Sequence, residues 1–124
     1  KKTRIVKKGT PMIMKLYTIY DRKAEAHLTP FNARSDGEAR RMIMETMISG
    51  QTKFVQFPGD YVLYGLGQFD DQTGVIVGCD RPEKISELTE ILDAVNRMAQ
   101  AQENLDEAGF MQADIEDAIN EAAE

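Results

Sequence analysis

Apolar and polar residues alternate with two different periods along the chain, and the two periods predict a sheet followed by helices. Residues 14–20 are rich in aromatic and β-branched side chains and predict a strand, whereas residues 24–31 form a weaker extended segment. Residues 61–69 and 75–78 predict two more strands. The polar segment 70–74 between them contains a glycine near its end, as hairpin loops commonly do.

A helix is predicted between the two pairs of strands. Ser35 can cap its first turn, and Glu38 three residues later completes a capping box. The helix should cover about residues 36–48 and end at Gly50, while residues 51–60 should form a loop. Its apolar residues recur at helical spacing: Ala39, Met42, Ile43 and Met47.

The C-terminal third predicts two amphipathic helices. Pro82 suits the first turn of a helix that extends from about Glu83 to Asn104. Gly109 then interrupts the pattern, and a second helix follows over residues 111–122. The apolar stripe of the first helix is wide, so this helix either packs on the domain or contacts another chain. The residues assigned to oligomer or partner contact are Ile85, Leu88, Ile91, Leu92, Val95, Met98 and Leu105.

These elements place the chain in the α+β class: a small antiparallel sheet (β-β-α-β-β) with one packed helix, followed by acidic amphipathic helices. We expect three parts, namely a basic flexible arm (1–13), a core domain (14–81) and an acidic helical tail (82–124). Apolar residues make up 42% of the chain, which argues against wholesale disorder.

Charge is distributed unevenly, although the net charge is only −6. Residues 1–23 carry eight bases and one acid, and residues 82–124 carry two bases and twelve acids. Such asymmetry is typical of a binding arm or tail. A basic segment can neutralise phosphates and release counterions from nucleic acid. The alternative is a solvated arm, with Tyr17 facing the core.

The cysteine content and the lengths of the apolar runs indicate the cell compartment and whether the protein contacts a membrane. The single cysteine, Cys79, allows no internal disulfide and favours an intracellular protein. No apolar run approaches the roughly 20 residues that span a bilayer, and no apolar segment of a signal peptide follows the basic start. We therefore expect no membrane contact.

Residues capable of catalysis are few. His27 and Cys79 lie in different predicted strands, and a nucleophilic pair needs both within hydrogen-bonding reach. The simpler interpretation is a surface histidine and a small core cysteine. Asp70 and Asp71 lack the spacing of a calcium loop and fit a hairpin turn. The Gly-Leu-Gly segment 65–67 indicates a bulge or a close backbone approach instead of a phosphate loop. We expect no enzymatic activity, no cofactor and no metal site.

Two separated motifs resemble one known family. The segment 14–26 (MKLYTIYDRKAEA), followed by Pro30-Phe31, resembles the opening of the nonstructural protein of gokushoviruses, small single-stranded DNA phages of the Microviridae. Ala39-Arg40 in the helix is also similar. The second half of the pattern matches in order and spacing through Pro58-Gly59-Asp60-Tyr61, Leu63-Tyr64, Leu66-Gly67, Phe69-Asp70-Asp71 and Thr73-Gly74.

The resemblance implies a protein made in the host cell cytoplasm and absent from the mature virion. Its expected role is that of the phiX-type protein that switches replication to single-stranded synthesis coupled to packaging. We therefore expect a non-enzymatic accessory protein that binds single-stranded or phage DNA. The alternative is a protein–protein adaptor or assembly factor, which forms a homo-oligomer or binds a phage replication or assembly protein through the C-terminal helices.

The residues assigned to DNA are basic side chains that would contact phosphates and two tyrosines that would stack on bases. They are Lys1, Lys2, Arg4, Lys7, Lys8, Lys15, Tyr17, Tyr20, Arg22, Lys23, Arg40 and Arg41.

Overall fold

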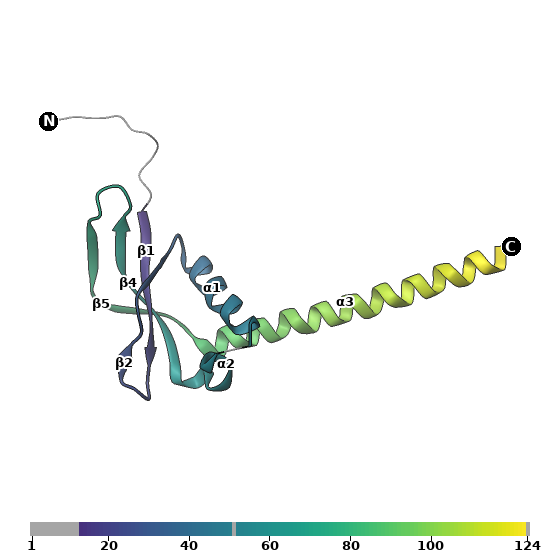
Figure 1. Ribbon diagram of the computed structural model, residues 1–124, viewed down its shortest axis with the longest axis horizontal. Helices are drawn as coiled ribbons and strands as arrows, with labels where there is room; N and C mark the ends of the chain where they lie inside the picture. The colour runs from purple at the N-terminus through teal and green to yellow at the C-terminus, as the bar shows by residue number, and fades with distance from the viewer. Residues whose placement is uncertain (1–12, 51, 124) are drawn as a thin grey trace. The chain divides into compact units, whose positions relative to one another are not determined.

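The structure, a computed structural model, describes residues 13–50 and 52–123, with side chains described as far as residue 108. The chain divides into two compact units, Lys1–Leu92 and Asp93–Glu124. The elements in chain order are β1 (Ile13–Asp21), β2 (Ala26–His27), β3 (Phe31–Ala33), α1 (Asp36–Ile48), α2 (Lys53–Gln56), the 3₁₀ turn η1 (Pro58–Asp60), β4 (Tyr61–Asp70), β5 (Ile76–Glu87) and α3 (Leu88–Ala123) (Figure 1). The predicted α+β class with a small antiparallel sheet is confirmed.

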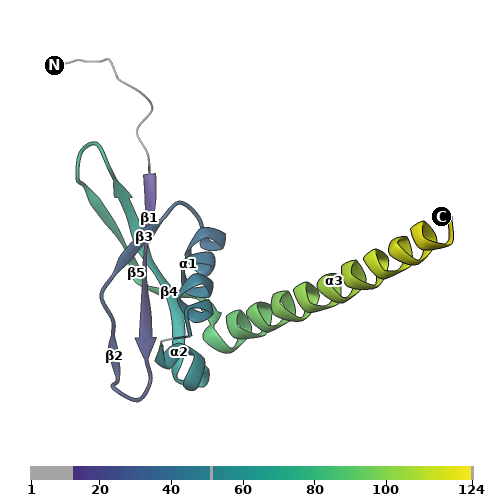
Figure 2. The same ribbon diagram turned by 45° about the vertical axis from the view of Figure 1, so that its right-hand side comes forward.

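The sheet is built around β1. Its strand order is β2-β1-β4-β5, and β3 also pairs with β1. All four pairings are antiparallel. Because β4 occupies one edge of β1 along its whole length, β2 and β3 share the other edge. Strand β2 can be followed beside β1 in Figure 2. Six of the nine β1 residues are apolar, and they do not alternate cleanly with polar residues.

Helix α1 packs on one face of the sheet. Tyr17 and Ile19 on β1 point to this face and are 1% and 6% exposed. The Tyr17 hydroxyl donates a hydrogen bond of 2.6 Å to Asp36 in the first turn of α1. From α1, Ala39, Ile43 and Met47 are buried. Because side chains alternate along a strand, Tyr20 points to the opposite face.

The predicted bounds of α1 are confirmed. The Ser35 side chain accepts a hydrogen bond of 3.1 Å from the Glu38 N–H, as an N-cap should. The Glu38 carboxylate in turn accepts from the Arg34 N–H at 2.7 Å. Gly50 follows the helix with a φ of 75°, a conformation that glycine adopts without strain.

Gly65 and Gly67 mark an irregular point in β4, as expected. The register of β4 shifts here against both of its neighbours. Gly67 has a φ of 152°, and a Cβ at this position would collide with the Val77 carbonyl oxygen and lie 2.8 Å from the Gly78 Cα. Only glycine lets β4 and β5 approach this closely.

The region after Val75 differs from the prediction. Pro82 lies inside β5 and does not start a helix, because an edge strand tolerates a residue without an N–H. The helix begins at Leu88 and continues through Gly109 without interruption, so one helix replaces the two that were predicted. A single glycine costs only about 1 kcal/mol inside a helix, which neighbouring helical residues can offset. Cys79 is exposed, not a core residue.

The core domain also extends further than predicted. Leu88 is fully buried and Ile91 is 3% exposed, and β5 runs through the expected boundary at 81/82. The compact unit therefore ends at Leu92. The segment 51–60, predicted as a loop, contains α2 and η1.

Candidate nucleic-acid interface

Three aromatic rings gather on the face of the sheet opposite α1. Tyr20 on β1 pairs directly with His27 on β2, and Tyr64 lies on β4, opposite Thr18. The ring centroids of Tyr20 and His27 are 4.8 Å apart, those of His27 and Tyr64 5.7 Å, and those of Tyr20 and Tyr64 6.3 Å. The tyrosines are half-buried and His27 is exposed. We call these three residues the aromatic trio.

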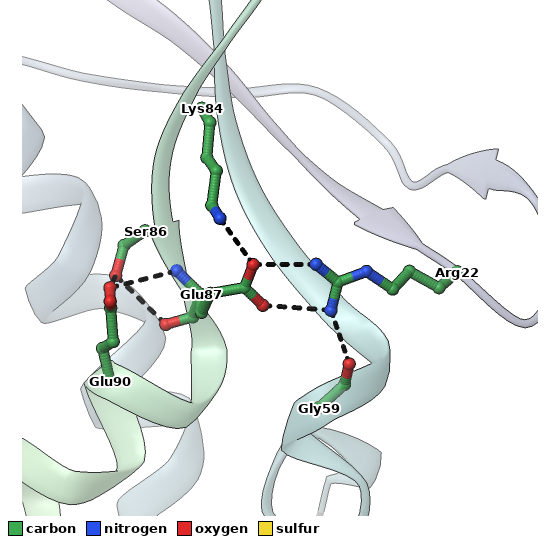
Figure 3. Close-up of polar contacts among 6 residues, drawn as sticks. All are labelled: Arg22, Gly59, Lys84, Ser86, Glu87 and Glu90. Carbon is green, nitrogen blue, oxygen red and sulfur yellow. Dashed lines mark hydrogen bonds and ion pairs between the residues drawn. The ribbon is translucent and has the colours of Figure 1, made fainter.

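A charged cluster adjoins the aromatic trio. Arg22, directly after β1, holds both carboxylate oxygens of Glu87 at 3.0 and 2.7 Å and donates to the Gly59 carbonyl at 2.6 Å (Figure 3). Lys84 reaches the same carboxylate at 2.7 Å. Because Lys84 is opposite Tyr64 in the β4–β5 pairing, the cluster and the trio share one face. We call Arg22, Lys84 and Glu87 the charged cluster.

Glu87 is held in place from a second side. Its backbone N–H donates to the Glu90 carboxylate at 3.2 Å, and the Ser86 hydroxyl donates to the same carboxylate at 2.9 Å. Glu90 lies in the first turn of α3, so its carboxylate satisfies an N–H at the start of that helix. The junction of β5 and α3 therefore fixes the position of the carboxylate that binds Arg22 (Figure 3).

The electrostatics of the cluster follow from these contacts. Hydrogen bonds from Arg22 and then Lys84 lower the pKa of Glu87 to about 2, against an ordinary value of 4.5. The same hydrogen bonds raise the pKa of Arg22 and of Lys84. The three groups are therefore all charged at neutral pH and leave one net positive charge.

The turn beside the cluster contributes little further positive charge. Lys23 is exposed, but Asp21 and Glu25 flank it, and the Asp21 carboxylate accepts from the Lys23 N–H at 2.9 Å. The surface therefore combines ring faces with an arginine, and its net charge is small. Arg22 uses three of its five N–H donors in the contacts described, and its side chain is 45% exposed.

The structure separates the predicted DNA-binding residues. Tyr20, Arg22 and Lys23 lie at or beside the aromatic trio. Lys15 points to the α1 face, where its Nζ is 3.9 Å from the Asp36 carboxylate. On α1, Arg40 donates to the Ile85 carbonyl at 3.4 Å and Arg41 is exposed. Lys1, Lys2, Arg4, Lys7 and Lys8 lie outside the described residues.

The structure corrects the role predicted for Tyr17. It was predicted as a possible base-stacking residue, but it is 1% exposed and its hydroxyl is bonded to Asp36. Its ring also stacks on Phe31, with centroids 5.7 Å apart. Burial raises the pKa of the Tyr17 hydroxyl, and the Asp36 hydrogen bond raises it further. A ring enclosed in this way is unable to stack on a base.

Four residues of this surface were missed at the level of sequence: His27, Tyr64, Lys84 and Glu87. His27 was interpreted as a plain surface residue and Tyr64 only as part of a strand. The available signal was the period of two in β4, which places Tyr64 and Val62 on the same face. Lys84 and Glu87 gave no signal, because both were assigned to a helix over residues that are part of β5 in the structure.

The residues predicted for partner contact fall into three groups. Leu88 and Ile91 are buried in the core of the first unit, and Ile85 is half-buried, so these three belong to the domain. Met98 is 54% exposed and Leu105 is 65% exposed on α3. Leu92 and Val95 are half-buried.

Other chemistry is limited in the described part of the chain. His27 on β2 and Cys79 on β5 are separated by β1 and β4, so they form no nucleophilic pair. Within the described residues, no group of three His, Cys, Asp or Glu side chains is placed to hold a metal ion. No helix there has the length and apolar character needed to cross a membrane.

The comparison with protein families agrees with the limits of the folded unit. Residues 14–91 match the family model described as Phage ORF5 protein. The chain belongs to the Phage ORF5 protein family. The matched segment begins in β1 and ends at the buried Ile91, so the Phage ORF5 region and the first compact unit nearly coincide. The expectation of a phage protein is confirmed. Comparison with curated proteins and with solved structures gives no match.

Proposed function

We propose that this phage protein is a non-enzymatic accessory factor that binds single-stranded DNA with the sheet face opposite α1. The observation that carries the proposal is the aromatic trio beside Arg22 and Lys84. Bases of a single strand stack on exposed rings, and cations at the edge of the rings contact the phosphates. A duplex offers no such unstacked bases, so the surface suits single strands.

A more specific role in phage replication is suggested by the resemblance to gokushovirus nonstructural proteins. We propose that the protein acts in the host cytoplasm when replication switches to single-stranded synthesis and packaging. A protein that coats or guides a newly displaced strand needs stacking and phosphate contacts and no catalytic group. Its modest local charge also favours reversible binding, because few counterions are released from each contact.

The test is a fluorescence anisotropy titration with a labelled single-stranded oligonucleotide at about 50 and 200 mM salt. Tyr64→Ala should weaken binding roughly tenfold, because loss of stacking on one ring costs about 1–3 kcal/mol. Phe57→Ala is the matched control, since Phe57 is an aromatic residue that belongs to neither the aromatic trio nor the charged cluster and is 55% exposed. Absence of binding at the lower salt, or equal losses in both variants, contradicts the proposal.

A second candidate function is a protein–protein adaptor that acts through α3. The exposed Met98 and Leu105 favour it, as does the composition of residues 93–124, which hold nine acids and one base. A partner would present apolar residues ringed by basic ones. A pull-down of host and phage proteins with Met98→Lys/Leu105→Lys against the unaltered chain distinguishes this candidate, since neither residue belongs to the aromatic trio.

A further inference from the structure

Strand β5 has an outer edge that no other strand covers in the described chain, and it lies at the margin of the sheet in Figure 1. Along the start of this edge, Val75, Ile76 and Val77 are 56%, 62% and 62% exposed. Ile13 on β1, 48% exposed, lines a hollow of about 290 Å³ together with Val75 and Val77. Apolar residues exposed singly are ordinary, but Val75, Val77 and Ile13 lie together on one face, with Ile76 exposed on the other, and such a cluster indicates a contact surface.

The backbone of this edge is ready to pair. The Asp70 N–H donates to the Val75 carbonyl at 3.0 Å, so the carbonyl of residue 75 faces β4. In an antiparallel ladder, alternate residues direct their N–H and C=O to opposite edges. With Val77 opposite Gln68 in the same register, Ile76 and Gly78 direct theirs outward.

The edge is also unprotected over this stretch. Proteins usually guard an exposed edge with lysine, proline or an inward charge. Such residues occur in the second half of β5, as Arg81, Pro82 and Lys84, but the segment from Val75 to Cys79 contains none. The unguarded part is therefore short and coincides with the exposed apolar residues.

We propose that two copies of the chain pair through this segment as antiparallel neighbours, with a two-fold axis at Val77. In this register, the outward groups of Ile76 meet those of Gly78 in the second copy. Val75 lies opposite Cys79 of the second copy, on the face that both Val77 side chains share. Asp80 and Arg81 meet Gly74 and Thr73, so no like charges face each other. A second copy therefore fits this edge without any added element.

The axis stands perpendicular to the sheet, so both copies of α1 lie on one side and both aromatic trios on the other. The dimer itself does not depend on DNA binding. Only the consequence that the two trios form one longer surface rests on the proposed function.

Cysteine cross-linking of the full chain tests the register. In a Cys79→Ser background, Val77→Cys should form a disulfide-linked dimer under mild oxidation, because residues opposite each other without mutual hydrogen bonds have Cα atoms about 4.5 Å apart. Ile76→Cys should cross-link poorly, since the two copies of residue 76 are offset along the strands beyond the roughly 7 Å limit. Ile48→Cys, 61% exposed on α1, measures random collision. Equal yields at 77 and 48, or a higher yield at 76, overturn the proposal.

Solution mass provides an independent measurement. The chain at about 50 μM should have twice its 14.0 kDa mass. Val77→Lys should be a monomer with an unchanged circular dichroism spectrum, because the side chain is 62% exposed and its loss leaves the core intact. Ile48→Lys should remain a dimer. A monomeric wild-type chain, or a dimeric Val77→Lys chain, overturns the inference; a dimer that binds no DNA overturns only the proposed function.

Discussion

Glu87 is a single carboxylate that contacts two cations, so one residue contributes both to stability and to the charge of the surface that we propose for DNA binding. Its oxygens bind Arg22 and Lys84 at 2.7 Å, and its side chain is 21% exposed. The carboxylate holds the end of β1 to the end of β5. At the same time it neutralises charge that DNA phosphates would otherwise meet.

Glu87→Gln should therefore lower stability and strengthen DNA binding together. We expect a loss of about 1 kcal/mol in the free energy of unfolding at pH 7, since the pair is only partly shielded from solvent. Affinity for single-stranded DNA at low salt should rise severalfold because one negative charge is removed. Chemical denaturation and anisotropy measure the two effects. A fall in both quantities would show that Glu87 positions Arg22 for DNA.

The pH dependence of stability has a defined sign. The pKa of Glu87 falls to about 2 in the folded chain, below its ordinary 4.5. Its contribution is therefore complete above pH 4.5 and is lost as the pH falls from 4.5 towards 2. Denaturation midpoints of the wild type should decline over this window more steeply than those of Glu87→Gln. Parallel curves would contradict the role assigned to the carboxylate.

Tyr17 and Tyr20 show where residue-level prediction from sequence stops. They are three positions apart, so a strand places them on opposite faces. Apolar residues occur on both faces of β1, so the pattern does not distinguish the two faces. Sequence could identify two tyrosines near basic residues, but only the pairing partners decide which ring is in the core and which can meet a base.

Tyr17→Phe tests the assignment of Tyr17 to the core and of Tyr20 to the proposed DNA-binding face. Removing the hydroxyl leaves the Asp36 carboxylate without its 2.6 Å donor and should cost about 1–2 kcal/mol of unfolding free energy. DNA affinity should be unchanged, as measured by the same titration. Tyr20→Phe is the counterpart on the other face. A loss of affinity in Tyr17→Phe at a salt and temperature where it is folded would contradict the assignment.

At the scale of elements, local signals predicted α1 and failed at β5 and α3. The cap at Ser35 and the stop at Gly50 are short-range devices, so the sequence contains them in full. The length of β5 depends on its pairing with β4 across a bulge, and no local pattern encodes it. Pro82 was misinterpreted because a proline fits both a helix start and an edge strand.

Gly67→Ala should disrupt the bulge between β4 and β5. The new Cβ would collide with the Val77 carbonyl oxygen, so the strands must separate, and we expect a loss of about 1–3 kcal/mol in unfolding free energy. Gly59→Ala is the control, because a Cβ at that position would meet no atom within 4 Å and its φ lies outside the left-handed region. Thermal denaturation measures both variants, and equal stability would contradict the close approach.

At the scale of the whole molecule, the end of the first compact unit determines which truncated chains should fold. A chain ending at Leu92 retains the buried Leu88 and Ile91 and should stay folded. It loses nine acids and one base, so it should bind single-stranded DNA more tightly at low salt. A chain ending at Arg81 lacks Ser86, Leu88 and Ile91 and should unfold. Circular dichroism and anisotropy compare the two. An unfolded 1–92 chain would show that the core also needs the part of α3 after Leu92.

The antiparallel edge of β5 has a directional consequence. A two-fold axis reverses the sense of everything it relates, so a strand that crosses one aromatic trio in the 5′ to 3′ direction meets the other trio in the opposite sense. One dimer would then accommodate two segments of opposite polarity, or a single strand that turns back between them. Single-stranded DNA closed into a loop should consequently compete better than an extended oligonucleotide of equal length.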